Sequence, residues 1–276
     1  MISSKNILEL KGKRKITVLT AYDFPTAAII DRAGIDMILV GDSLANVVLG
    51  LESTREVGMA EMLHHAKAVT RATKRSLVVG DMPYDSYQTN TKVCVNNARR
   101  FIDEANCGAV KVEWFEQCPE VANEIADAGI PVIGHIGLTP QTANKLGGFK
   151  VQGKDAETAR HLIAQAVELE KSGCFAVVIE CVPEKLAGMI TERLRIPTIG
   201  IGAGASCDGQ VLVINDLLGL MEGFRPKFVK QYANLASQIQ RAVEKYRYEV
   251  VEGKFPDADH SYAMEEAEFR KLKAGT

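Results

Sequence analysis

The chain has 276 residues, 46% of them hydrophobic, with 33 basic and 35 acidic side chains and a formal net charge of -2. This composition is typical of a soluble globular protein with one large domain or two ordinary ones. The charges are dispersed and form no basic stripe, so nucleic acid is excluded as an expected partner. No apolar run reaches the roughly 18 residues that a membrane-spanning helix needs, so no membrane partner is expected either.

The N-terminal segment MISSKNILELKGKRK lacks the continuous apolar core of a secretory signal, which predicts a cytoplasmic protein. The six cysteines are scattered and form no C-x-x-C pair. This spacing indicates neither a zinc site nor a disulfide framework, and we expect reduced thiols.

From residue 16 onward, β-branched apolar runs alternate with longer segments of helical pattern, as in βα units that build a parallel sheet. Strands are predicted at 16–22, 36–41, 77–82, 109–113, 131–136, 176–181, 197–202 and 210–214. Helices are predicted between them at 25–34, 60–75, 92–108, 119–129, 155–173 and 183–194. Eight strands within roughly 200 residues favour an α/β fold of the (β/α)₈ TIM barrel type over an open doubly wound sheet.

No linker rich in Pro, Gly or Ser divides the chain, so residues 1–276 are predicted to form a single domain, with the barrel at about 16–225. Residues 226–252 predict an extra C-terminal helix, with an apolar stripe at Phe228, Tyr232, Leu235, Ile239 and Val243. Such a stripe either completes the barrel or contacts a neighbouring subunit. The polar tail that follows is expected to lose order toward its end.

Acidic residues stand where four predicted strands end: Asp42 in ILVGDS, Asp81 in LVVGDMP, Glu113 in AVKVE and Glu180 in AVVIEC. A barrel brings these strand ends together around one mouth. Like charges in one place repel unless a cation or a chemical task holds them there. The pattern therefore predicts a metal site with a base beside it. Because all the donors are oxygens, a hard cation such as Mg²⁺ is favoured.

Two cationic side chains and a hydroxyl accompany the acids. Lys111 precedes Glu113 by two residues, so both side chains are predicted to point into the barrel. Such a lysine either binds a substrate carboxylate or forms a structural ion pair with a nearby acid. His135, at the end of its strand, either donates a hydrogen bond to a substrate oxygen or bonds to a loop. The same two roles are open for Ser43, which follows Asp42.

Weaker candidates lie elsewhere in the chain. The segment GIGAGASCDG at 200–209 follows the seventh strand, where many barrels bind phosphate, but tight-turn geometry is the favoured explanation of its glycines. His64 and His65 are adjacent on a predicted outer helix, and we expect them to be surface or packing residues.

The sequence resembles the ketopantoate hydroxymethyltransferase family, also called 3-methyl-2-oxobutanoate hydroxymethyltransferases. The similar stretches follow the family's order over nearly the whole catalytic body: TAYD (20–23), DRAGIDMILVGDSL (31–44), DMPYDSY (81–87), GAVKVE (108–113), IPVIGHIGLTPQ (130–141), GGFKVQG (147–153) and IPTIGIGAGASCDGQVLV (196–213). GLTPQ together with GGFKVQG is a highly specific signature. The chain departs from the family at Trp114 and Phe115, where two glycines are common, and at Ala45 and Asn46, where Gly-Met is common.

The resemblance implies a Mg²⁺-dependent barrel enzyme of pantothenate and coenzyme A synthesis. Such an enzyme transfers a one-carbon unit from 5,10-methylenetetrahydrofolate to 3-methyl-2-oxobutanoate, giving 2-dehydropantoate. It implies that Asp42, Asp81 and Glu113 hold the metal, directly or through water. It also implies that the 2-oxo acid is bound at Asp42, Ser43, Asp81, Lys111 and His135, that Glu180 is the general base, and that the chain forms a homo-oligomer, such as a decamer.

The chemistry accounts for these residue types. Removal of the C3 proton leaves negative charge on the ketone oxygen, and a chelated metal stabilises that charge as it develops. Two other functions stay open: a related Mg-dependent 2-oxo acid aldolase or lyase that uses no folate, and a catalytically silent barrel that only binds a metabolite or a protein. Trp114 and Phe115, the aromatic residues at the rim, are expected to affect the choice or use of the one-carbon donor more than the formation of the enolate.

Overall fold

Eight parallel strands close into a barrel in the computed structural model, which describes residues 1–142, 150–221, 223 and 225–275. Each strand pairs with the next in sequence, and β8 pairs back with β1. The strands are β1 (Ile16–Thr20), β2 (Met37–Val40), β3 (Leu77–Asp81), β4 (Ala109–Glu113), β5 (Val132–Gly137), β6 (Ala176–Glu180), β7 (Thr198–Ile201) and β8 (Gly209–Leu212). All the predicted strands are present and the TIM barrel prediction is confirmed.

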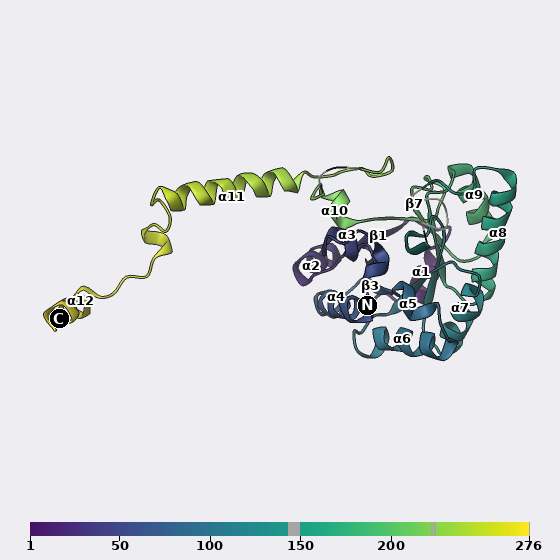
Figure 1. The fold of residues 1–276 in the computed structure, drawn as a ribbon, viewed down its shortest axis with the longest axis horizontal. Helices are drawn as coiled ribbons and strands as arrows, with labels where there is room; N and C mark the ends of the chain where they lie inside the picture. The colour runs from purple at the N-terminus through teal and green to yellow at the C-terminus, as the bar shows by residue number, and fades with distance from the viewer. Residues whose placement is uncertain (143–149, 222, 224, 276) are drawn as a thin grey trace.

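Helices cover the outside of this barrel (Figure 1). The long ones match the six predictions between strands: α2 (Phe24–Arg32), α4 (Met59–Ala72), α6 (Thr91–Asp103), α7 (Cys118–Asp127), α8 (Ala156–Lys171) and α9 (Glu184–Arg193). Shorter helical segments are α1 (Ser4–Leu10), α3 (Leu44–Val47), η1 (Thr54–Glu56), α5 (Tyr84–Tyr87) and α10 (Ile214–Leu217). Several of the helices, long and short, begin at a residue whose side chain caps the helix N-terminus. Asp155, for example, accepts hydrogen bonds from the backbone N–H groups of Glu157 and Thr158, a contact that stabilises a helix by about 1 kcal/mol.

Alternation along the strands divides the core into two layers. Side chains such as Val18, Val79 and Ile133 fill the inside of the barrel, whereas Val110 and Val112 pack under the helices. On β4 the inward positions are Ala109 and then, nearer the carboxyl end, Lys111 and Glu113. The inside is therefore apolar at the amino end of the barrel and charged at its carboxyl end.

The connection from β7 to β8 contains no helix. Residues 202–208 join the two strands directly, and the glycines in this segment fit against their neighbours. Gly202 (φ +63°) lies under the Phe228 ring, and a Cβ there would come within 2.8 Å of a ring carbon. Gly204 (φ +82°) faces the side chain of Glu184, which a Cβ would meet at 2.4 Å. Backbone conformation and close packing thus account for these glycines.

The extra C-terminal helix is present, but it begins later than predicted. It is α11 (Leu235–Val251), and the predicted start at 226 was wrong. Pro226 and the residues after it form a turn and loop instead. The N–H of Tyr232 donates to the carbonyl of Leu217, the last residue of α10, and the N–H of Leu235 donates to that of Leu218. The side chain of Asn234 caps the helix.

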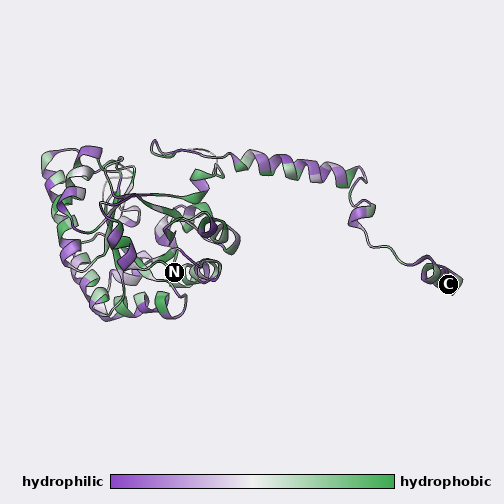
Figure 2. Cartoon of the chain, turned by 180° about the vertical axis from the view of Figure 1, so that it is seen from behind, coloured by the Kyte–Doolittle hydropathy of each residue, from purple (hydrophilic) through white to green (hydrophobic). Residues whose placement is uncertain are grey.

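This helix does not complete the barrel. No residue of α11 is buried, and the helix extends away from the barrel toward the C-terminus (Figures 1 and 2). The tail carries a short turn, η3 (Ala258–His260), and a last helix, α12 (Glu266–Ala274). No helix among the described residues is long and apolar enough to cross a membrane. All six cysteines have free thiols.

Candidate active site

The predicted acids meet at one end of the barrel because their strands are neighbours. In the sheet register Asp81 lies beside Lys111, Glu113 beside His135, and Gly137 beside Glu180. Asp42 follows the end of β2, the strand next to β3. The convergence expected from the sequence is therefore present in the structure.

Asp81 and Lys111 form a buried ion pair at the centre of this cluster. The Lys111 Nζ lies 2.6 Å from Asp81 Oδ1 and 3.8 Å from Glu113 Oε1. Lys111 and Asp81 are 3% and 1% exposed, so water screens the pair little. Of the two roles left open for Lys111, the structure contains the ion pair, and contact with a substrate carboxylate stays a prediction.

His135 bridges two carboxylates. Its Nδ1 lies 3.4 Å from Glu113 Oε1 and its Nε2 lies 3.3 Å from Glu180 Oε2. Neither approach has the alignment of a hydrogen bond, so the attraction is one of charge. Glu180 is more open than its neighbours, with 15% of its side chain exposed. A carboxylate with access to solvent can receive a proton from a bound molecule.

The pKa values in the cluster depart from their ordinary range. Burial raises the pKa of Asp81 to about 7, although Lys111 works to lower it. Burial also raises the pKa of Glu113. For His135, burial alone would lower the pKa, but Glu113 and Glu180 outweigh it and raise the pKa to about 9. Similarly, burial works to lower the pKa of Lys111, but the charges of Asp81 and Glu113 raise it.

The segment after β2 brings Asp42 and Ser43 to the same place. The backbone N–H of Asp42 donates to Asp81 Oδ2 over 3.1 Å. The Ser43 hydroxyl lies 2.7 Å from the hydroxyl of Tyr22, which is buried under the rim. The Nδ1 of His65 lies 2.6 Å from the carbonyl oxygen of Tyr22, so His65 is a packing residue, as expected.

Two residues that support the site, Gln141 and Tyr87, were not predicted from the sequence. The backbone N–H of Gln141 donates to Glu113 Oε2 over 3.0 Å, and the Tyr87 hydroxyl donates to the Gln141 side chain over 2.5 Å. The backbone N–H of Glu113 in turn donates to the Tyr87 hydroxyl over 3.3 Å. Both residues belong to stretches that resemble the family, DMPYDSY and GLTPQ, and this was the available signal. Within GGFKVQG, residues 147–149 lie outside the described residues.

The donor set fits a hard cation, although no metal cluster is ready-made. Among the described residues, no three His, Cys, Asp or Glu side chains are close enough together to hold a metal ion by themselves. The Lys111 ammonium lies within 4 Å of both Asp81 and Glu113. Two buried oxygens, Asp42 Oδ2 and Glu113 Oε1, have no hydrogen-bond partner. Mg²⁺ often takes only one or two carboxylates and fills its other positions with water and substrate, so these oxygens suit it.

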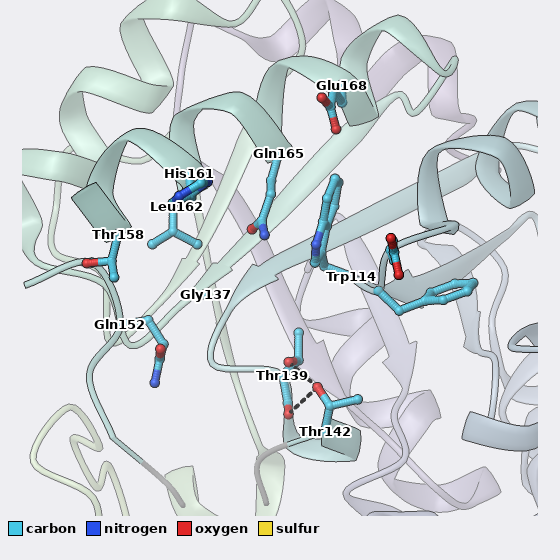
Figure 3. Close-up of a pocket in the computed structure, with 13 residues that line it drawn as sticks. Trp114, Gly137, Thr139, Thr142, Gln152, Thr158, His161, Leu162, Gln165 and Glu168 are labelled. Carbon is cyan, nitrogen blue, oxygen red and sulfur yellow. Dashed lines mark hydrogen bonds between the residues drawn. The ribbon is translucent and has the colours of Figure 1, made fainter. Parts of the chain in front are cut away.

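A groove opens at the carboxyl ends of β4 and β5. Its volume is about 640 Å³, and its walls come from the loops after β4 and β5 and from one face of α8 (Figure 3). Trp114 and Phe115, which follow Glu113, stand on one side, and Gln165 and Glu168 of α8 stand on the other. The volume of this groove falls in the range of small-molecule sites.

The fold and the site define a TIM barrel with an acidic catalytic end. Its sequence matches the family model of ketopantoate hydroxymethyltransferase over residues 2–258. The chain belongs to this enzyme family, and the resemblance found in the sequence is confirmed.

Curated relatives and solved structures agree with this placement. The chain is 56% identical over 252 residues to 3-methyl-2-oxobutanoate hydroxymethyltransferase of Moorella thermoacetica, covering 91% of this chain and 93% of the relative. It is 53% identical over 262 residues to the enzyme of that name from Syntrophomonas wolfei, covering 95% of each. A phosphonopyruvate hydrolase solved in complex with oxalate and Mg²⁺ has the same fold, with a TM-score of 0.62 at 12% identity, covering 100% of this chain and 96% of that one.

Proposed function

We propose that this enzyme transfers a hydroxymethyl group from 5,10-methylenetetrahydrofolate to 3-methyl-2-oxobutanoate and so produces 2-dehydropantoate. The observation that carries the proposal is the convergence of four acids, Lys111 and His135 at one barrel end, in a chain that is about half identical to enzymes of that name. Small molecules are the expected substrates of such a site.

Glu180 is the general base. It is the carboxylate of the cluster with solvent access, and it stands beside cationic His135. Its carboxylate accepts the C3 proton of the 2-oxo acid.

Asp42, Asp81 and Glu113 hold Mg²⁺, directly or through water. Four carboxyl groups face two cationic groups here, so the cluster has an excess of acid that favours uptake of a cation. When bound, the ion supplies positive charge at the ketone oxygen. A solved barrel of the same fold that holds oxalate and Mg²⁺ supports this assignment. Lys111 and His135 orient the substrate carboxylate and ketone, and Ser43 donates a hydrogen bond at the rim.

The test is proton NMR of 3-methyl-2-oxobutanoate in D₂O with the purified enzyme. We expect loss of the C3 proton signal that requires Mg²⁺ and that Glu180→Gln abolishes without weakening metal binding. Continued exchange in Glu180→Gln would remove Glu180 as the base. An exchange rate unaffected by a chelator would remove the metal. A silent barrel would produce no exchange at all.

Whether product formation depends on the folate donor distinguishes the transferase from an aldolase or lyase that forms the same enolate. Product formation is expected to require methylenetetrahydrofolate, and free formaldehyde or another aldehyde is expected to replace it poorly. Efficient product formation from an aldehyde alone would favour the aldolase.

The enzyme works as a cytoplasmic homo-oligomer, such as a decamer. Six free thiols and the family's chemistry support the compartment. For the assembly, the support is one face of α11, where Ile239, Val243, Tyr246 and Val250 are 44 to 58% exposed at helical spacing. Truncation after Asn234 is expected to lower the mass measured by sedimentation while the barrel stays folded. An unchanged mass would place the interface elsewhere.

A further inference from the structure

Glu113 ends β4, and its two carboxylate oxygens have different surroundings. Oε2 accepts a hydrogen bond over 3.0 Å from the backbone N–H of Gln141, in the segment after β5. Oε1 is buried and has no hydrogen-bond partner among the residues that the structure describes. It lies 3.4 Å from His135 Nδ1 and 3.8 Å from Lys111 Nζ. One oxygen is therefore tied to the fold, and the other faces the charged groups inside the barrel.

The side chain of Gln141 holds this N–H in place through both ends of its amide. Its Oε1 accepts a hydrogen bond from the Tyr87 hydroxyl over 2.5 Å, and its Nε2 donates to the carbonyl oxygen of Met82 over 3.1 Å. Met82 directly follows β3, and its own N–H donates to the carbonyl oxygen of Lys111 on β4 over 3.0 Å. Gln141 is only 1% exposed, so water competes little for these bonds. The amide thus joins the segment after β5 to the end of β3.

Tyr87 completes the arrangement. It is the last residue of α5 and is buried, and its ring makes an edge contact with the Phe115 ring at 5.7 Å between centroids. Its hydroxyl donates to Gln141 and accepts the backbone N–H of Glu113 over 3.3 Å. A hydroxyl suits this position because it is a donor and an acceptor at once. This one group therefore connects Gln141 with the backbone of the acid that Gln141 holds.

The network ends at one oxygen of Glu113, and this feature points to a role beyond the fold. A network that served the fold alone would satisfy all its members, because each unpaired buried acceptor costs stability. Here the hydrogen bonds stop at Oε2, and Oε1 stays at the cluster together with Asp42 Oδ2, the other buried carboxylate oxygen without a partner among the described residues. A carboxylate that is already oriented needs no reordering when it takes up a cation, and this favours binding.

We propose that Gln141 and Tyr87 are positioning residues that orient Glu113 so that its Oε1 is kept for the metal ion, directly or through water. The inference rests on the proposed function, because it uses the proposed metal site. Neither positioning residue is a proposed metal ligand. Gln141 acts on Oε2 through its backbone N–H, and Tyr87 acts through Gln141 and the Glu113 backbone. Loss of either side chain's hydrogen bonds lets the carboxylate rotate and weakens the site while every ligand is still present.

The test is titration of the enzyme with Mn²⁺, which shares the preference of Mg²⁺ for oxygen ligands and is measured by electron paramagnetic resonance. Tyr87→Phe keeps the buried ring and removes only the hydroxyl, and Gln141→Leu removes both amide bonds at similar side-chain size. Each variant is expected to raise the dissociation constant of Mn²⁺ about tenfold, the scale of losing a group that orients a metal ligand. Tyr84→Phe, at the first residue of α5, is the matched control and is expected to leave the constant unchanged.

The proton exchange of 3-methyl-2-oxobutanoate in D₂O, followed as Mg²⁺ is added, separates positioning from damage to the fold. In both variants the Mg²⁺ concentration that gives half-maximal exchange is expected to rise about tenfold, while the maximal rate falls by a smaller factor. A lower maximal rate at an unchanged half-saturating concentration, or unchanged affinity for Mn²⁺, would overturn the positioning role alone.

The wild-type enzyme tests the foundation of this inference. If it bound no Mn²⁺, the proposed metal site would be wrong and the positioning role would fall with it. Should Gln141→Leu fail to fold, Tyr87→Phe decides, because it retains the aromatic ring and its contact with Phe115.

Discussion

At the amino end of the barrel, the buried acids Asp31 and Asp36 accept hydrogen bonds at both carboxylate oxygens. At the carboxyl end, some buried carboxylate oxygens have no hydrogen-bond partner. Asp31 accepts hydrogen bonds from the backbone N–H groups of residues 74–76 and from the Ser76 hydroxyl. Asp36 accepts two from Arg14 over 2.8 and 2.6 Å and two from Thr17. At the other end, Asp42 and Glu113 each keep a buried oxygen without a hydrogen-bond partner.

The pKa shifts at the two ends have opposite signs. Burial works to raise the pKa of Asp31 and of Asp36, but their hydrogen bonds outweigh it and lower the pKa of both. For Asp81, burial outweighs the attraction of Lys111 and raises the pKa to about 7. Acids at the amino end therefore stabilise the fold. Those at the carboxyl end cost stability, and such groups cluster where chemistry requires them.

The largest effect that tests this comparison is expected from Asp81→Asn. Loss of this carboxylate is expected to reduce product formation by about 10³-fold, the scale of losing one group that stabilises developing charge. The matched variant at the other end is Asp36→Asn, which is expected to lower stability while activity per folded molecule stays at the wild-type level. Steady-state kinetics and urea unfolding of both variants measure this. A comparable loss of activity in Asp36→Asn would break the comparison.

A second effect, on stability alone, is expected from Asp31→Ala. Its removal leaves backbone N–H groups near Ser76 without an acceptor, and Asp31 is only 5% exposed. We expect the free energy of unfolding to fall by about 3 kcal/mol. Urea denaturation followed by circular dichroism measures the change, with Asp155→Ala at an exposed helix cap as a milder control. A decrease no larger than the control's would mean that Asp31 has no special part in the fold.

The sequence predicted the strands and the acids because both follow from local rules. Alternating patterns located the strand ends, and the closure of a parallel barrel brought Asp42, Asp81, Glu113 and Glu180 together. The same rules placed Lys111 inside the barrel. The single domain over residues 1–276 stays a prediction, as do the metal and substrate contacts of the site.

What the sequence could not provide were contacts between distant segments. The ion pair of Lys111 with Asp81 depends on the register of β3 against β4, which no local pattern encodes. The delayed start of α11 depends on hydrogen bonds from residues 232–236 to the end of α10 and the two residues after it, and these override an apolar stripe. The role of Asp31 depends on a loop more than forty residues away.

The smallest effect is expected in the pH dependence of stability. The contributions of acids at the amino and carboxyl ends of the barrel are expected to change with pH in opposite directions. A carboxyl group with a lowered pKa stabilises the protein above its unfolded pKa, near 3.9, and this contribution is lost as pH falls through the folded pKa. The stability difference between wild type and Asp36→Asn is therefore expected to shrink as pH falls from 5 toward 2.

Asp81 is expected to behave in the opposite way in metal-free protein. Its pKa is raised, so its contribution is fully present below about pH 3.9 and is lost as pH rises through about 7. Relative to Asp81→Asn, the wild-type protein should thus lose stability between pH 4 and 7, whereas relative to Asp36→Asn it should gain stability as pH rises from 2 to 5. Urea unfolding of the three proteins across this range measures both slopes. Slopes of the same sign would show that the two ends of the barrel hold their acids in equivalent surroundings.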